Sequence, residues 1–67
     1  MNQNEIVLDY MKTHGSITPL EAMQLGIMRL ASRISDLRKM GYAIIRTMES
    51  HVNANGVKKT YARYSLA

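Results

Sequence analysis

The chain contains no cysteine, no tryptophan and no phenylalanine, and only one proline among its 67 residues. Without cysteine it can form neither a disulfide framework nor a thiolate metal site. The two histidines, His14 and His51, lie far apart with no metal-ligand spacing between them, so we expect neither a metal ion nor any other cofactor. A chain this short buries only about 60% of its unfolded surface. We expect one domain over residues 1–67, with a carefully patterned core.

Long apolar segments are also missing. No apolar run approaches the roughly 20 residues that a bilayer span requires, and the first five residues lack the basic segment of a signal peptide. We therefore expect a cytoplasmic protein with no membrane partner. The serines and histidines have no companion acid at a suitable spacing, and no glycine-rich phosphate loop occurs. These absences predict a protein that is not an enzyme and has no small-molecule substrate.

The positive charge is concentrated in the C-terminal part. Residues 1–28 carry one lysine against three acidic residues, a net charge of −2, whereas residues 29–67 carry eight basic residues against two acidic ones, a net charge of +6. A charge step of this kind within one small domain suggests a polyanion partner on the C-terminal side. A solvated surface explains an excess of lysine and arginine equally well, so charge alone does not decide between the two.

Local signals predict two helices before residue 27. Asn4 can cap a first helix, and Gly15 ends it as a residue with a left-handed backbone conformation would. Thr18 starts the second helix, because a proline follows it and Glu21 stands three residues later, which completes a capping box. Gly26 ends this helix after about two turns. Ser16 and Ile17 form a short connector or a single strand rung, and Ala22, Met23 and Leu25 supply a small buried face.

A third helix is expected from about Met28 to Met40, with Gly41 ending it. Leu30, Ile34 and Leu37 repeat at helical spacing and predict its buried edge. The opposite side carries most of the charged and polar residues of this helix: Arg29, Ser32, Arg33, Asp36 and Lys39.

The remaining residues predict a β-hairpin. Residues from Tyr42 to about Ser50 favour β structure, residues 53–56 contain an Asn-Gly turn signal, and residues 57–66 return as a second strand with Tyr64 and Leu66 facing inward. Three helices followed by a hairpin predict an α+β fold. We interpret it as a winged helix-turn-helix with a three-helix core and a C-terminal β-hairpin wing.

The spacing within the helical pair agrees with this interpretation. Ala22 is the small residue expected where the two helices cross, and Gly26 lies at the corner between them. Ile34 and Leu37 are the apolar pair that seats the second helix of the unit. The corner is two residues longer than in the tightest helix-turn-helix units, which winged versions tolerate.

Several segments resemble a known family. Residues 18–22 (Thr-Pro-Leu-Glu-Ala), 25–27 (Leu-Gly-Ile), 29–38 (Arg-Leu-Ala-Ser-Arg-Ile-Ser-Asp-Leu-Arg) and 41–44 (Gly-Tyr-Ala-Ile) are similar to the small winged helix-turn-helix proteins of bacteriophages and prophages. The resemblance covers about residues 6–66 and is loosest in the hairpin. It implies a DNA-binding protein from a phage or another mobile element.

Candidate DNA contacts lie on the third helix. Arg29 and Arg33 are one turn apart near its start, and arginine can bind guanine O6 and N7 with two hydrogen bonds, which discriminates by roughly 1–3 kcal/mol. Ser32 lies between them and can reach a phosphate or a base. Asp36 either orients Arg33 or Lys39 through an ion pair or accepts a hydrogen bond from cytosine. The alternative for this whole face is solvated charge.

The expected wing adds Asn55, Lys58 and Lys59, which suit contact with phosphates or with the minor groove. Their alternative role is a charged edge that prevents strand-to-strand aggregation. The sequence thus predicts a sequence-preferring double-stranded DNA-binding protein in transcription regulation or phage recombination. A homodimer, or several copies on repeated sites, would supply the surface that a single module lacks. The alternative function is a protein-binding winged-helix adaptor that modulates a host or phage regulator; structured RNA is a third candidate.

Overall fold

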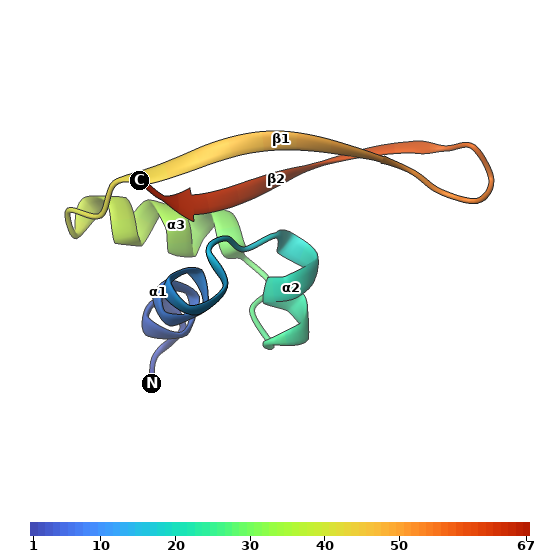
Figure 1. Cartoon of the computed structure of the whole chain (residues 1–67). Helices are drawn as coiled ribbons and strands as arrows, with labels where there is room; N and C mark the ends of the chain where they lie inside the picture. The colour runs from blue at the N-terminus through green and yellow to red at the C-terminus, as the bar shows by residue number, and fades with distance from the viewer.

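The computed structural model describes residues 1–67 and has three helices followed by an antiparallel hairpin (Figure 1). The elements are α1 (Gln3–His14), α2 (Pro19–Gln24), α3 (Leu30–Lys39), β1 (Ile44–Val52) and β2 (Lys58–Leu66). This arrangement confirms the α+β winged helix-turn-helix fold that the sequence predicts.

The first helix begins earlier than expected. Asn2, rather than Asn4, is the N-cap, and its side-chain oxygen accepts a hydrogen bond of 2.8 Å from the backbone N–H of Glu5. Both asparagines are good caps, but Asn4 lies inside the first turn with its Oδ1 buried. Gly15 ends α1 with φ of 89°, a conformation that glycine adopts without steric cost.

The capping box of α2 is confirmed. The Glu21 carboxylate accepts a hydrogen bond of 2.9 Å from the backbone N–H of Thr18, and the Thr18 hydroxyl accepts one of 3.3 Å from the N–H of Glu21. These reciprocal bonds satisfy donors that a helix start leaves open. The helix is only six residues long. The chain then turns through Gly26, whose φ is 83°.

The hairpin forms a continuous ladder from Ile44 opposite Leu66 to Val52 opposite Lys58. The single strand rung expected in the connector is present, because Ile17 and Tyr64 exchange backbone hydrogen bonds of 2.8 and 2.9 Å. At the tip, the Asn53 side chain accepts hydrogen bonds of 3.0 Å from the N–H groups of Asn55 and Val57. The hairpin is therefore anchored to the helical part through β2.

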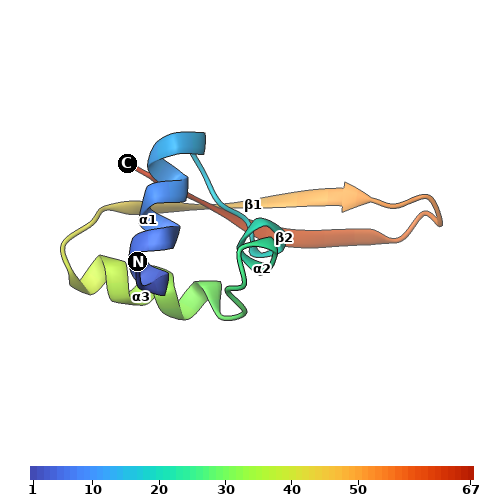
Figure 2. The ribbon, with the colours of Figure 1, turned by 90° about the horizontal axis from the view of Figure 1, so that it is seen from below.

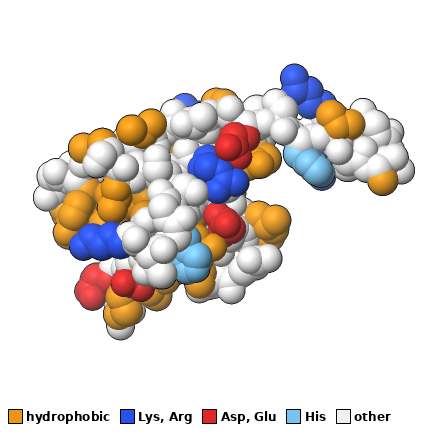
Figure 3. Space-filling model, viewed as in Figure 1, with side chains coloured by type: hydrophobic (Ala, Val, Ile, Leu, Met, Phe, Trp, Pro, Cys, Tyr) orange, Lys and Arg blue, Asp and Glu red, His pale blue; other side chains and the backbone are white.

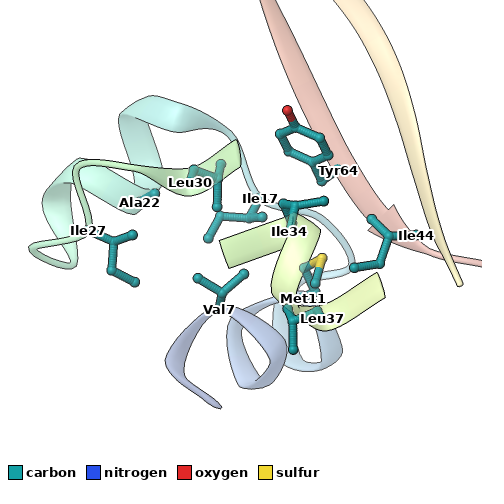
Figure 4. Close-up of a cluster of buried hydrophobic side chains, with 10 residues drawn as sticks. All are labelled: Val7, Met11, Ile17, Ala22, Ile27, Leu30, Ile34, Leu37, Ile44 and Tyr64. Carbon is teal, nitrogen blue, oxygen red and sulfur yellow. The ribbon is translucent and has the colours of Figure 1, made fainter. Parts of the chain in front are cut away.

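A single core joins the helices to the base of the hairpin. In Figure 4, Tyr64 and Ile44 point from the hairpin toward the side chains of the helices. The buried core consists of Val7, Met11, Ile17, Ala22, Ile27, Leu30, Ile34, Leu37, Ile44 and Tyr64. The predicted buried edge of α3 is thus confirmed.

The prediction that Met23 and Leu25 supply a buried face was wrong, because both are exposed. Ile27, in the corner after α2, fills the space instead and is 2% exposed. Its backbone N–H donates a hydrogen bond of 2.8 Å to the Ala22 carbonyl, which folds the corner back onto α2. The reason is geometric: α2 is too short to bury more than one face, and the corner that follows it completes the core.

The hairpin is much longer than the helical body requires. Figures 1 and 2 show α3 and the base of the hairpin running side by side, with the hairpin continuing past α2 and past the N-terminal end of α3. The overall dimensions are accordingly elongated, 40 × 23 × 20 Å. The outer half of the hairpin is a projecting wing.

An arginine fixes the direction of this wing. Arg63 on β2 donates hydrogen bonds of 2.8 Å to Glu49 on β1 and 2.9 Å to the Ser16 hydroxyl, and its Nη1 lies 4.0 Å from the Glu21 carboxylate. The guanidinium thereby connects both strands, the connector and the start of α2. A planar group with several donors is well suited to such a junction.

The junction makes stability depend on pH. The hydrogen bond from Arg63 holds the pKa of Glu49 below its usual value. A carboxyl group whose folded pKa is lowered stabilises the fold above its unfolded pKa, and this contribution is lost as the pH falls through the folded pKa. We expect stability to decline on acidification below the ordinary glutamate pKa, and Glu49→Gln to flatten that decline.

Urea unfolding at a series of pH values measures this effect. Glu5→Gln is the matched control, because Glu5 is exposed and forms no ion pair. Identical pH profiles for wild type and Glu49→Gln would show that the charge of Glu49 beside Arg63 adds nothing to stability.

Candidate nucleic-acid interface

The outer side of α3 is the first component of the candidate interface. Leu30, Ile34 and Leu37 face the core, so the residues half a turn away face solvent. Ser32 and Lys39 are exposed on that side. Figure 2 shows α3 at the edge of the molecule, with no other element outside it. An uncovered helix side of this kind can enter the major groove, which is wide enough for one helix.

Arg33 and Asp36 lie on the flank of α3 rather than at the centre of its outer side. Both are half-buried, and Arg33 Nη2 lies 3.2 Å from Asp36 Oδ2. Arg33 Nη1 also approaches Gln3 Oε1 of α1 at 3.5 Å, while its Nε is buried without a hydrogen-bond partner. Asp36 thus orients Arg33, one of the two roles that the sequence leaves open. A base contact by Arg33 would require this pair to rearrange.

Arg29 has a different environment. It occupies the N-cap of α3, and its side chain makes no capping bond. The helix itself begins at Leu30, two residues later than the sequence predicts. It is exposed and borders a shallow hollow lined by Gln3, Gly26, Met28, Arg29 and Arg33. A guanidinium free of partners at a helix start can reach a base edge or a phosphate without breaking a protein contact.

The wing contributes the predicted residues Asn55, Lys58 and Lys59, all of them exposed. Lys58 lies opposite Val52 and Lys59 lies opposite His51 in the ladder. Successive side chains of a strand point to opposite faces, so the two lysines project from opposite faces of the hairpin. Because the wing is narrow, it presents positive charge on both sides.

The comparison with protein-family models matches residues 2–67 to the family described as the winged helix-turn-helix domain. The chain belongs to this family. No curated protein and no solved structure gives a significant match. Membership in the family indicates DNA binding, and helix-turn-helix domains are typically DNA-binding modules rather than enzymes.

Several cations of this winged helix-turn-helix domain have no acidic partner. Only Arg33 and Arg63 lie within 4.0 Å of a carboxylate. The basic side chains without such a neighbour are Lys12, Arg29, Arg38, Lys39, Arg46, Lys58 and Lys59. In Figure 3, by contrast, basic and acidic side chains lie next to each other where the wing leaves the body. The unpaired positive charge therefore belongs mainly to α3 and the wing.

The predicted contacts omit three exposed residues, two on or beside α3 and one on β1. Ser35 lies between Ser32 and Lys39 on the outer side of α3, Met28 precedes α3 and is 76% exposed, and Arg46 is exposed on β1. The helical wheel could have identified Ser35. Met28 is one of five exposed methionines, and only Met11 is buried. No local signal marks Arg46, because its exposure depends on how the hairpin packs.

Arg38 has a structural role at the other end of α3. Its Nη2 donates a hydrogen bond of 3.0 Å to the carbonyl of Ile44, the first residue of β1. The bond holds the end of the helix against the start of the hairpin.

The structure contains no helix that is long and apolar enough to cross a membrane.

Proposed function

We propose that this chain is a sequence-preferring double-stranded DNA-binding protein that acts in transcription regulation or recombination of a phage or another mobile element. The observation that supports this proposal best is the uncovered outer side of α3, which has the unpaired Arg29 at the end nearest the wing. The similarity of its helical motifs to phage proteins supports the proposed setting.

In this proposal α3 lies in the major groove. Arg29 binds a guanine or a flanking phosphate, and Ser32, Ser35 and Lys39 contact bases or phosphates along the helix. Serine side chains discriminate weakly because they can both donate and accept hydrogen bonds. We therefore expect most of the base discrimination to come from Arg29 and less of it from the middle of α3.

The wing binds the neighbouring backbone. Lys58 and Lys59 neutralise phosphates, and Asn55 at the tip is placed to reach the minor groove. Phosphate contacts fix the orientation of a protein on the duplex without reading sequence. The wing thus contributes affinity and salt dependence, whereas α3 contributes the sequence preference.

A titration of defined duplexes tests the proposal, once a preferred sequence has been selected from a random pool with the purified protein. We expect Arg29→Ala to cost about 1–3 kcal/mol on the preferred duplex and less on a scrambled one. Lys12→Ala is the matched control, because Lys12 is an exposed cation of α1 outside the proposed interface. Arg33→Ala is expected to cost less than Arg29→Ala, since its guanidinium is already paired with Asp36.

Equal losses on both duplexes would make Arg29 a phosphate contact only. If no duplex is preferred and binding is insensitive to salt, the DNA-binding proposal fails. In that case the alternative function, a winged-helix adaptor that binds a protein regulator, would replace it.

A further inference from the structure

The outer edge of β1 has no strand beside it. In the sheet, β1 pairs only with β2, and the other edge of β2 receives Ile17. Beyond α2 the hairpin stands clear of the helices in both ribbon views (Figures 1 and 2). A nine-residue strand is therefore open to pairing along most of one side.

The register identifies the backbone groups that point outward. Tyr64 exchanges both hydrogen bonds with Ile17, so its N–H and C=O point away from β1. Its ladder partner Arg46 must then direct its own N–H and C=O away from β2, because directly opposite residues form either a bonded or a non-bonded pair. Because this direction alternates along a strand, Met48 and Ser50 also direct their N–H and C=O groups away from β2. The carbonyl of Ile44, two residues before Arg46, should point the same way, and it does accept a hydrogen bond from Arg38 outside the hairpin.

This edge lacks most of the devices that usually keep strands apart, although it carries two charged side chains, Arg46 and Glu49, of which Glu49 is bonded to Arg63. β1 contains no proline and no lysine, and its ladder with β2 runs without a bulge. Instead, three of its apolar side chains are 50–59% exposed: Ile45, Met48 and Val52. The one outward carbonyl with a partner is that of Ile44, so the edge is open from Arg46 onward.

We propose that this edge pairs with the same edge of a second copy of the chain, antiparallel, about a two-fold axis at Met48. Met48 is the midpoint of β1. In this register Met48 faces Met48 of the second copy and Arg46 faces Ser50, all of which have outward N–H and C=O groups. Three such pairs form about six hydrogen bonds, two in each pair. The two hairpins then make one four-stranded sheet.

The side chains favour a second copy as the partner. With the axis at Met48, the apolar Met48 pairs with itself and Thr47 faces Glu49, so no charged residue faces a like charge. With the axis at Glu49, by contrast, two carboxylates would face each other. An isologous interface must be complementary to itself, and β1 meets that condition about its own centre. This proposal goes beyond DNA binding, because it concerns the free protein.

Sedimentation of the free protein across micromolar to millimolar concentrations tests the proposal. We expect the mass to rise from one chain toward two. Met48→Pro should remain a single chain, because it removes an outward N–H and leaves the β1–β2 ladder intact. A thermal melt checks that this variant folds. A wild-type mass of one chain at every concentration would overturn the proposal, as would a Met48→Pro variant that dimerises like the wild type.

A cross-linking experiment keeps the test valid if the proline variant unfolds. The chain has no cysteine, so single-cysteine variants are unambiguous. Directly opposite residues in a bonded pair have Cα atoms about 5.5 Å apart, within disulfide range. We expect Met48→Cys to form a disulfide-linked dimer faster than Met23→Cys, an exposed position on α2 outside the hollow between α2 and the hairpin. Equal rates would place the contact elsewhere. No DNA is present, so neither result depends on the DNA-binding proposal.

Discussion

Replacing Ala22 by leucine is expected to destabilise the fold by about 1–3 kcal/mol, the usual cost of adding volume to a packed core. Ala22 is fully buried, and Figure 4 shows it beside Leu30 and Ile27. Its carbonyl also accepts the backbone bond that closes the corner. A larger side chain must push this corner away from α3. Each kcal/mol lowers the melting temperature of a domain this small by about 4–8 °C.

The same substitution should weaken DNA binding at temperatures where the protein remains folded, although Ala22 itself is not exposed. The reason is that the corner positions Arg29 at the start of α3. Thermal melts followed by duplex titration measure both effects. Ala31→Leu is the control for stability, since Ala31 is an exposed alanine of α3. If Ala22→Leu has the melting temperature and the DNA affinity of the wild type, α2 does not set the position of α3.

Neutralising both wing lysines is expected to weaken binding to every duplex by a similar factor. Each phosphate contact contributes about 0.9 to the slope of log affinity against log salt. The double variant Lys58→Gln, Lys59→Gln should therefore flatten that slope by about one to two units. Titrations at several salt concentrations, with Lys12→Gln as the control for net charge, measure the change.

The single variants add information that the double variant lacks. Lys58 and Lys59 project from opposite faces of the hairpin. If only one face of the wing lies against the backbone, one single variant should account for the whole change in slope. If the wing enters a groove, each should account for part of it. An unchanged slope in the double variant would mean that the wing does not contact DNA.

The sequence alone determined the features that depend on neighbours along the chain. Thr18 and Glu21 form their capping box because both bonds lie within one helical turn. Leu30, Ile34 and Leu37 are buried because helical geometry places them on one stripe. The Asn-Gly turn and the order of the elements were predictable for the same reason, and together they were sufficient to predict the winged helix-turn-helix fold.

Other features depended on contacts between residues far apart in the sequence. Arg33 lies on the flank of α3 beside Gln3, a residue 30 positions away, and Arg63 bonds Ser16 across 47 positions. No local pattern predicts such contacts.

The exposure of Met48 and the open edge of β1 depend on the hairpin being longer than the body that supports it. Short-range hydrogen bonds and periodicity thus determined the elements. Only the packing of α1, α3 and β2 around one core decided which charged side chains remain exposed and unpaired, because that packing determines which side of each element is covered.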